Sequence, residues 1–161
     1  MVRQQRTVAR PGSVSGIGLH TGAECTLTLR PAPCDHGLKF KHKDLVIDAH
    51  ISHVRHTQRQ TALGSYEGTV FTIEHVLSAL YGMDIDNALI EMTASEAPIC
   101  DGSATAYVEL IERCGVVEQG AIVPTMKLRR PIRIETGGSI LVALPYDAFI
   151  LAAPMSTARK A

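Results

Sequence analysis

Apolar residues recur at helical spacing between positions 73 and 81, and this pattern constrains the fold more than any other. The spacing is the i, i+3, i+4, i+7, i+8 pattern of an amphipathic helix. The residues that make it are Ile73, Val76, Leu77, Leu80 and Tyr81. Thr72 is a suitable N-cap and Gly82 a suitable stop. The chain must therefore supply an apolar surface against which one face of this helix can pack.

Strand patterns elsewhere predict that surface. Between Glu24 and Arg30, apolar and polar residues alternate with the period of a half-buried strand, and Pro31 follows. Weaker strand patterns cover residues 38–40, 45–49 and 87–93. A second helix is expected from a cap at Ser103 to Gly115. Its inner face is expected to carry Ala104, Tyr107, Val108 and Ile111.

These elements predict an α+β fold in which two helices cover one face of a mostly antiparallel sheet, as a two-layer domain over residues 1–123. Pro124 is the expected boundary. Beyond it, residues 126–135, 139–144 and 148–152 are expected to form three strands of a meander that no helix covers. Residues 124–161 are thus predicted to be the opening strands of an incomplete second domain.

Composition limits the function classes. The chain has 161 residues and 45% hydrophobic residues, enough for one good core, and its sixteen basic and sixteen acidic side chains cancel. This balance argues against a general nucleic-acid or membrane-surface binder. The first ten residues are basic and polar and resemble neither a signal peptide nor a membrane anchor, which predicts a cytoplasmic protein without an integral membrane segment.

Four cysteines, Cys25, Cys34, Cys100 and Cys114, lack the C-x-x-C spacing of a structural zinc site or a redox centre. They are expected to be reduced and mostly buried.

Glu74 and His75 are adjacent at the start of the expected helix, where their side chains diverge by about 100° yet can border one cleft. The helix N-terminus favours a carboxylate and disfavours an imidazolium, so His75 would keep a lone pair for a metal. A carboxylate beside a metal-bound water is the arrangement of metal-assisted hydrolysis. The pair can equally be an exposed helix cap, and a catalytic zinc needs three protein ligands.

Other polar residues are weaker candidates. His20 lies in the glycine-rich bend of residues 12–22, and His53 and His56 lie at the start of a polar stretch, residues 55–63, that is either an edge strand or a binding loop. A turn is expected to follow this stretch over residues 64–68. Each histidine taken singly is more typical of a surface position. Asp101 is expected to accept hydrogen bonds from turn amides before the second helix.

The order of four motifs is more specific than any one of them. "QRTVARPGSVSGIGLHTG", "TLTLRPAP", "TVFTIEHVLSALYGMDIDNALIEM" and "EAPICDGSATAYVELIERCG" follow one another along residues 3–123. Together they resemble the UDP-3-O-acyl-N-acetylglucosamine deacetylase family, which removes an acetyl group early in lipid A synthesis in Gram-negative bacteria. The resemblance implies two similar α+β domains that enclose a zinc site. "RRPIRIETGGSILVALPYDAFIL" is similar to the opening strands of the family's second domain.

The resemblance also implies residue roles. His75 matches a zinc ligand and Glu74 the general base on the zinc-bound water. His20 matches a histidine at the cleft. The residues that resemble a loop lining the acyl-chain passage are Thr57, Gln58, Arg59, Gln60, Thr61 and Leu63. The expected cofactor is Zn²⁺ and the expected substrate a UDP-sugar lipid precursor.

The family's remaining zinc ligands, in a His-x-x-x-Asp motif, and its proposed general-acid histidine lie in the second domain, whereas no histidine follows His75 here. The chain alone is therefore expected to be inactive, as a truncated deacetylase that lacks its C-terminal half. The alternatives are one half of a split enzyme and a non-catalytic binding module.

Overall fold

The computed structural model describes residues 3–65 and 68–152, and the chain divides into two compact units, 1–123 and 124–161. The first unit contains a five-stranded sheet with the order β2-β3-β9-β4-β5. Its strands are β2 (Gly12–Ile17), β3 (Glu24–Pro31), β9 (Ala88–Met92), β4 (Leu38–His42) and β5 (Leu45–Asp48). The β4–β9 pair is parallel and the other pairs are antiparallel.

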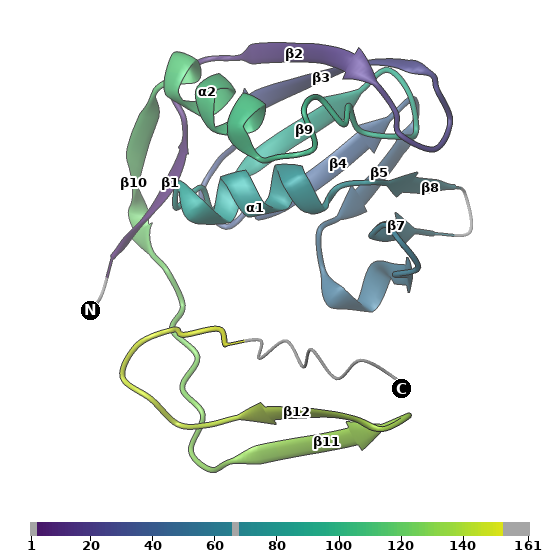
Figure 1. Cartoon of the computed structure of the whole chain (residues 1–161). Coiled ribbons are helices and arrows are strands. Elements are labelled where there is room, and N and C mark those ends of the chain that lie inside the picture. Colours follow the sequence, from purple (N-terminus) through teal and green to yellow (C-terminus); the bar gives the residue numbers. More distant parts are fainter. Residues whose placement is uncertain (1–2, 66–67, 153–161) are drawn as a thin grey trace. The chain divides into compact units, whose positions relative to one another are not determined.

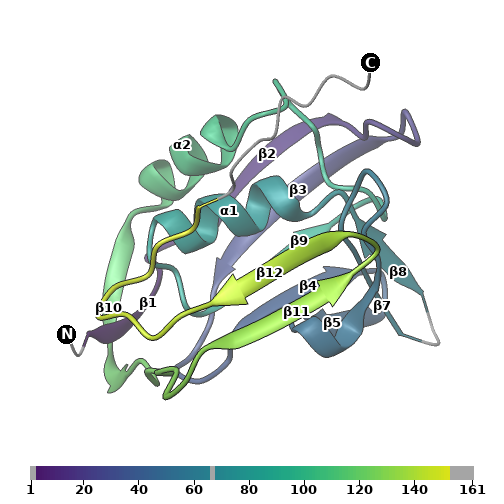
Figure 2. The same ribbon diagram turned by 60° about the horizontal axis from the view of Figure 1, so that its bottom comes forward.

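Two helices, α1 (Glu74–Gly82) and α2 (Thr105–Cys114), lie side by side over one face of this sheet (Figures 1 and 2). The expected two-layer α+β fold with a mostly antiparallel sheet is confirmed. The apolar positions of β3 are buried as the alternation predicted, with Leu27 and Leu29 at 0% and 1% exposure. Burying each such side chain contributes about 1.5–3 kcal/mol, so the strand and the helices stabilise each other.

The helix faces differ in part from the prediction. In α1 the buried residues are Val76, Ala79 and Leu80, while Tyr81 is 66% exposed, so its expected place on the inner face is wrong. The helix is oriented so that the small side chain of Ala79, rather than the bulky ring of Tyr81, packs against the core. Tyr107 and Ile111 of α2 are buried as expected.

Both predicted N-caps also need correction. Ile73 and Ala104 occupy the cap positions of α1 and α2, in the helical region and without a side-chain cap bond. Thr72 instead donates its hydroxyl hydrogen to the carboxylate of Glu96. Ser103 stays close to its expected role, because its Oγ accepts a hydrogen bond from the backbone N–H of Thr105.

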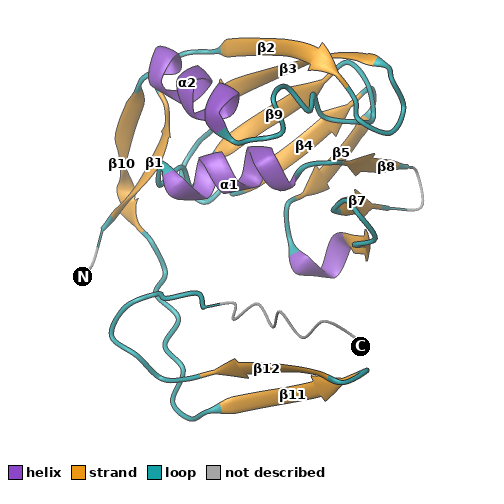
Figure 3. Ribbon diagram, in the orientation of Figure 1, coloured by secondary structure: helices purple, strands orange, loops and turns teal. Residues whose placement is uncertain are grey.

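Two smaller sheets complete the first unit (Figure 3). One pairs β1 (Gln4–Val8) with β10 (Val116–Ile122), neither of which the sequence patterns indicated. The other has the order β6-β7-β8 and follows a short 3-10 helix at Ile51–His53. Its strands are β6 (Val54–His56), β7 (Ala62–Gly64) and β8 (Thr69–Phe71). The turn expected over residues 64–68 lies partly outside the described residues.

The second unit contains one antiparallel hairpin, β11 (Ile132–Thr136) with β12 (Ser139–Ala143). Gly137 and Gly138 join the strands with φ values of 55° and 80°, as a two-residue turn with two left-handed residues requires. The expected third strand at residues 148–152 is wrong, and residues 126–131 are not a strand either. Neither segment has a hydrogen-bonded partner strand within the described residues, so the apolar pattern alone does not make them strands.

Within the described ranges, no helix is long and apolar enough to cross a membrane. The cysteine prediction holds for Cys25 and Cys114, which are buried and free. Cys34 and Cys100 are free but exposed.

Candidate active site

Glu74 and His75 open α1, and both side chains are half-buried. Ile73 and Val76 are buried on either side of the pair and fix this turn against the core. A carboxylate in the first turn of a helix is favoured by about 0.3–1 kcal/mol through the helix dipole. The structure therefore presents the pair from a rigid element rather than from a loose end.

The carboxylate of Glu74 is held at one oxygen only. The backbone N–H of Thr61 donates to Glu74 Oε2 at 2.9 Å, while Oε1 has no hydrogen-bond partner in the described ranges. The first contact orients the carboxylate. The second oxygen is left to accept a proton or a hydrogen bond from a ligand.

The stretch of residues 57–63 proves to be the β6–β7 connection and the start of β7. Gln60 and Thr61 reach the start of α1, since Gln60 Oε1 lies 3.3 Å from the Thr72 hydroxyl. Leu63 is 2% exposed and packs in the core rather than facing solvent, as all three residues of β7 are buried. Thr57, Gln58 and Arg59 are exposed on the connection.

His20 is exposed, and it is fixed through its backbone rather than its ring. Its N–H donates to Glu96 Oε1 at 2.9 Å, and the Thr72 hydroxyl donates to the same oxygen at 2.9 Å. The glycine-rich bend and the residues that lead into α1 are therefore tied to one carboxylate. Glu96 was not among the site residues predicted from the sequence, although an isolated acid in the apolar context of "SEAPI" is a signal that could have indicated it.

Thr72 has a φ of 58°, in the left-handed region, and it is 1% exposed. For a β-branched residue this conformation is a genuine outlier and costs about 1–3 kcal/mol. Such strain persists only where the surroundings determine the conformation, and strained residues concentrate at functional sites. The strain here lies two residues before Glu74.

Asp101 accepts hydrogen bonds from the N–H and hydroxyl of Ser103, as the sequence predicted. Those bonds hold the pKa of Asp101 below its ordinary value. Although Cys100 as a whole is exposed, partial desolvation of its thiol raises the pKa of that group.

The other two histidine candidates do not join this group. His53 Nδ1 contacts the backbone oxygen of Asp48 at 3.0 Å, and His56 is exposed on β6.

A zinc ion requires three protein ligands even in an open catalytic site. No group of three or more His, Cys, Asp or Glu side chains that could hold a metal ion occurs among residues 3–65 and 68–152. The donor set of the described residues does not fit a complete zinc site, although the imidazole of His75 is a suitable single ligand.

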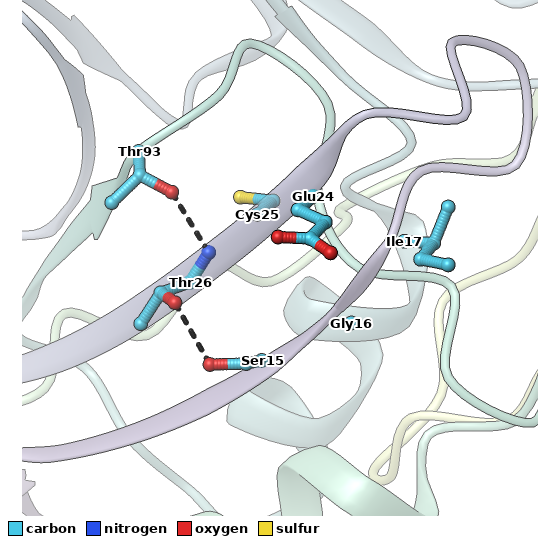
Figure 4. A pocket seen from close by; sticks show the side chains of 7 residues that line it. All are labelled: Ser15, Gly16, Ile17, Glu24, Cys25, Thr26 and Thr93. Atoms are coloured by element: carbon cyan, nitrogen blue, oxygen red, sulfur yellow. Dashed lines mark hydrogen bonds between the residues drawn. The ribbon is translucent and has the colours of Figure 1, made fainter.

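A shallow hollow of about 490 Å³ lies on the opposite side of the sheet pair β2–β3 from the helices and does not include Glu74 or His75 (Figure 4). Its hydroxyl groups bind one another or the backbone: Ser15 and Thr26 are 2.8 Å apart, and the Thr26 N–H donates to Thr93 Oγ1. Because these hydroxyl groups are already paired and the hollow does not include the Glu74–His75 pair, we assign the candidate site to the start of α1.

Comparison with known proteins places these features in a family. Residues 5–160 match the family described as UDP-3-O-acyl N-acetylglycosamine deacetylase, LpxC. The chain is 43% identical over 151 residues to a UDP-3-O-acyl-N-acetylglucosamine deacetylase of Idiomarina loihiensis, covering 91% of this chain and 49% of that relative. Proteins of the same name from Saccharophagus degradans and Pseudomonas entomophila are each 41% identical, over 91% and 92% of this chain and 50% of each relative. The chain thus spans about half the length of the curated relatives it matches.

Proposed function

This chain belongs to the UDP-3-O-acyl N-acetylglycosamine deacetylase family, and from that premise we propose that it supplies one half of a zinc-dependent deacetylase site. The substrate would be a UDP-3-O-acyl-N-acetylglucosamine, and the reaction would remove its N-acetyl group in lipid A synthesis. The observation that carries the proposal is the anchored Glu74 carboxylate beside His75 at the start of α1.

Each residue of the half-site has a role in the proposal. His75 would provide one imidazole ligand, and the remaining ligands would come from a second half, whether a continuation of the chain or a separate polypeptide. Residues 124–161 would then be the opening strands of that half. When bound, a zinc ion polarises a carbonyl and makes a water molecule more acidic.

Glu74 would take the proton of the attacking water at Oε1, while the Thr61 N–H holds Oε2 in place. Breaking the amide bond also requires a proton on the departing amine. In the proposal the donor is a histidine of the second half. Gln60, Thr61 and His20 would border the substrate, and Thr57, Gln58 and Arg59 would extend this border toward the acyl chain. Leu63, which is buried, would support this border from the core rather than touch the substrate.

The test uses a completed enzyme, in which this chain is joined to the second half of the Idiomarina loihiensis relative. Glu74→Ala should lower turnover of the UDP-linked substrate by about 10²-fold or more, the loss typical of a missing general base. Ser78→Ala, an exposed position on the same helix, is the control and should keep wild-type turnover.

Measuring bound zinc distinguishes the proposed role of His75 from that of Glu74. His75→Ala should reduce bound zinc, whereas Glu74→Ala should retain it. A helix cap without catalytic function would instead give a Glu74→Ala enzyme with nearly unchanged turnover, and that result would reject the proposal.

A cytoplasmic location stays a prediction.

A further inference from the structure

We propose that Glu96 is the positioning residue of this site: one buried carboxylate that sets both the His20 bend and the start of α1. The inference rests on the proposed function of Glu74 and His75. It assigns Glu96 no contact with substrate or metal.

The carboxylate of Glu96 is 0% exposed, and donors occupy both of its oxygens. Oε1 accepts from the His20 N–H and the Thr72 hydroxyl, each at 2.9 Å. Oε2 accepts from the N–H of Thr21 at 2.7 Å and from its hydroxyl at 2.6 Å. A carboxylate has about four acceptor sites, so these donors use its full capacity. No basic side chain in the described ranges forms an ion pair with Glu96, and hydrogen bonds alone satisfy the buried charge.

Three of these bonds, one from His20 and two from Thr21, hold the glycine-rich bend. Gly18 bonds with Ala23 and Gly22 through the backbone, which folds residues 18–23 around the carboxylate. A Cβ at Gly18 would overlap the Glu96 carboxyl group, so the absence of a side chain there lets the two segments approach. The direction of the exposed His20 ring follows from this backbone arrangement.

The other bond reaches the turn before Glu74. Thr72 is buried and left-handed, and its hydroxyl carries a single hydrogen. The Thr72 hydroxyl oxygen lies 2.9 Å from Glu96 Oε1 and 3.3 Å from Gln60 Oε1. Glu96 is the nearer acceptor, so the hydrogen points to it. Because Thr72 precedes Glu74 by two residues, its backbone conformation sets the direction in which α1 begins.

Glu96 is itself held on a fixed platform. Phe71 exchanges backbone hydrogen bonds with Ser95 and Ala97, at 3.0 and 3.1 Å. On the other side, the Tyr107 hydroxyl of α2 donates to the Pro98 carbonyl. The loop of residues 95–98 is thus fastened to β8 and to α2, which makes the carboxylate a rigid reference point for both site segments.

The first test measures residue-resolved amide hydrogen exchange in this chain. Glu96→Gln keeps the shape but places an amide NH₂ against two donors, so the bend and the turn should both loosen. Exchange should accelerate roughly tenfold or more at His20 and Thr21, whose N–H groups donate to Glu96, and at Leu77, whose N–H donates to the Ile73 carbonyl in the first turn of α1, with the central strands unchanged. Glu91→Gln is the matched control, because Glu91 is a paired carboxylate on the outer face of β9. Acceleration confined to residues 20–21 would overturn the inference.

A second pair of variants covers the case in which Glu96→Gln does not fold. Thr72→Val keeps the β-branched shape and removes only the hydroxyl, so exchange should rise at Leu77, in the first turn of α1, while Thr21 stays protected. Thr72→Ser restores a hydroxyl donor and should rescue most of that protection. Equal behaviour of the two variants would reject a role for the Thr72–Glu96 bond.

Kinetics of the completed enzyme give the functional measurement. Glu96→Gln should lower kcat by about 10²-fold, as small misplacements of catalytic groups do, with KM within about threefold of wild type. Wild-type kcat in Glu96→Gln would overturn the inference. If the wild-type completed enzyme shows no deacetylation, the proposed function fails, and the exchange data still decide whether Glu96 positions the two segments.

Discussion

A buried carboxylate destabilises a protein unless hydrogen bonds replace the water it loses. Burial by itself would raise the pKa of Glu96, but hydrogen bonds from Thr21, His20 and Thr72 outweigh it and hold the pKa below the ordinary value of 4.5. The ionised form is therefore the form that the fold stabilises. At the residue scale, the arrangement of the site depends on this charge.

The lowered pKa predicts a specific pH dependence of stability. The contribution of Glu96 is fully present above the unfolded-state pKa near 4.5 and is lost as the pH falls through the lower folded-state pKa. The difference in free energy of unfolding between wild type and Glu96→Gln should thus be constant near neutral pH and shrink below about pH 5. Urea unfolding from pH 7 to pH 3 measures it. The other carboxylates are the same in both proteins, so their contributions cancel in this difference. A difference that stays constant down to pH 3 would contradict the assignment.

Local patterns predicted the elements more reliably than their faces and ends. The alternation in β3 and the helical spacing of residues 73–81 predicted strand and helix because each pattern is set by local geometry. Thr72 was expected as a cap from its type, whereas its hydroxyl donates to Glu96, 24 positions away in sequence. The β1–β10 pair likewise joins the two ends of the first unit. Such contacts between distant residues leave no periodic signal in a single sequence.

The end of α2 gives a test at the element scale. Gly115 follows the helix with a φ of 70° and a ψ of 161°, a region in which essentially only glycine is stable. Gly115→Ala should lower the free energy of unfolding by about 1–3 kcal/mol. Gly82, the last residue of α1, has open space around it, and Gly82→Ala should be neutral or slightly stabilising. Denaturant unfolding of both variants compares them. Equal losses would show that the backbone conformation at Gly115 is not the cause.

At the scale of the whole molecule, the two units differ in how much core they contain. The first unit buries a continuous cluster between its sheet and helices. In the hairpin of the second unit, Ile134, Ile140 and Leu141 are 55%, 57% and 66% exposed. An isolated hairpin is marginally stable at best in water. This contrast agrees with the proposal that residues 124–161 require a further part to pack against.

Hydrogen exchange of the chain alone tests that contrast. Amides of β11 and β12 should exchange as fast as those of fraying chain ends. Amides of β3 and β9 should be protected nearly as strongly as the global free energy of unfolding allows. In the completed enzyme, protection of the hairpin should rise. Strong protection of β11 and β12 in the chain alone would show that the second unit is stable by itself.

The central claim is that Glu74 and His75 form half of a zinc deacetylase site. Its most direct test assays zinc content and deacetylation of UDP-3-O-acyl-N-acetylglucosamine in two samples, the chain alone and the chain joined to the second half of the Idiomarina loihiensis relative. We predict neither stoichiometric zinc nor turnover for the chain alone, and both for the completed enzyme. Turnover by the chain alone, or a folded completed enzyme without zinc and without activity, would contradict the claim.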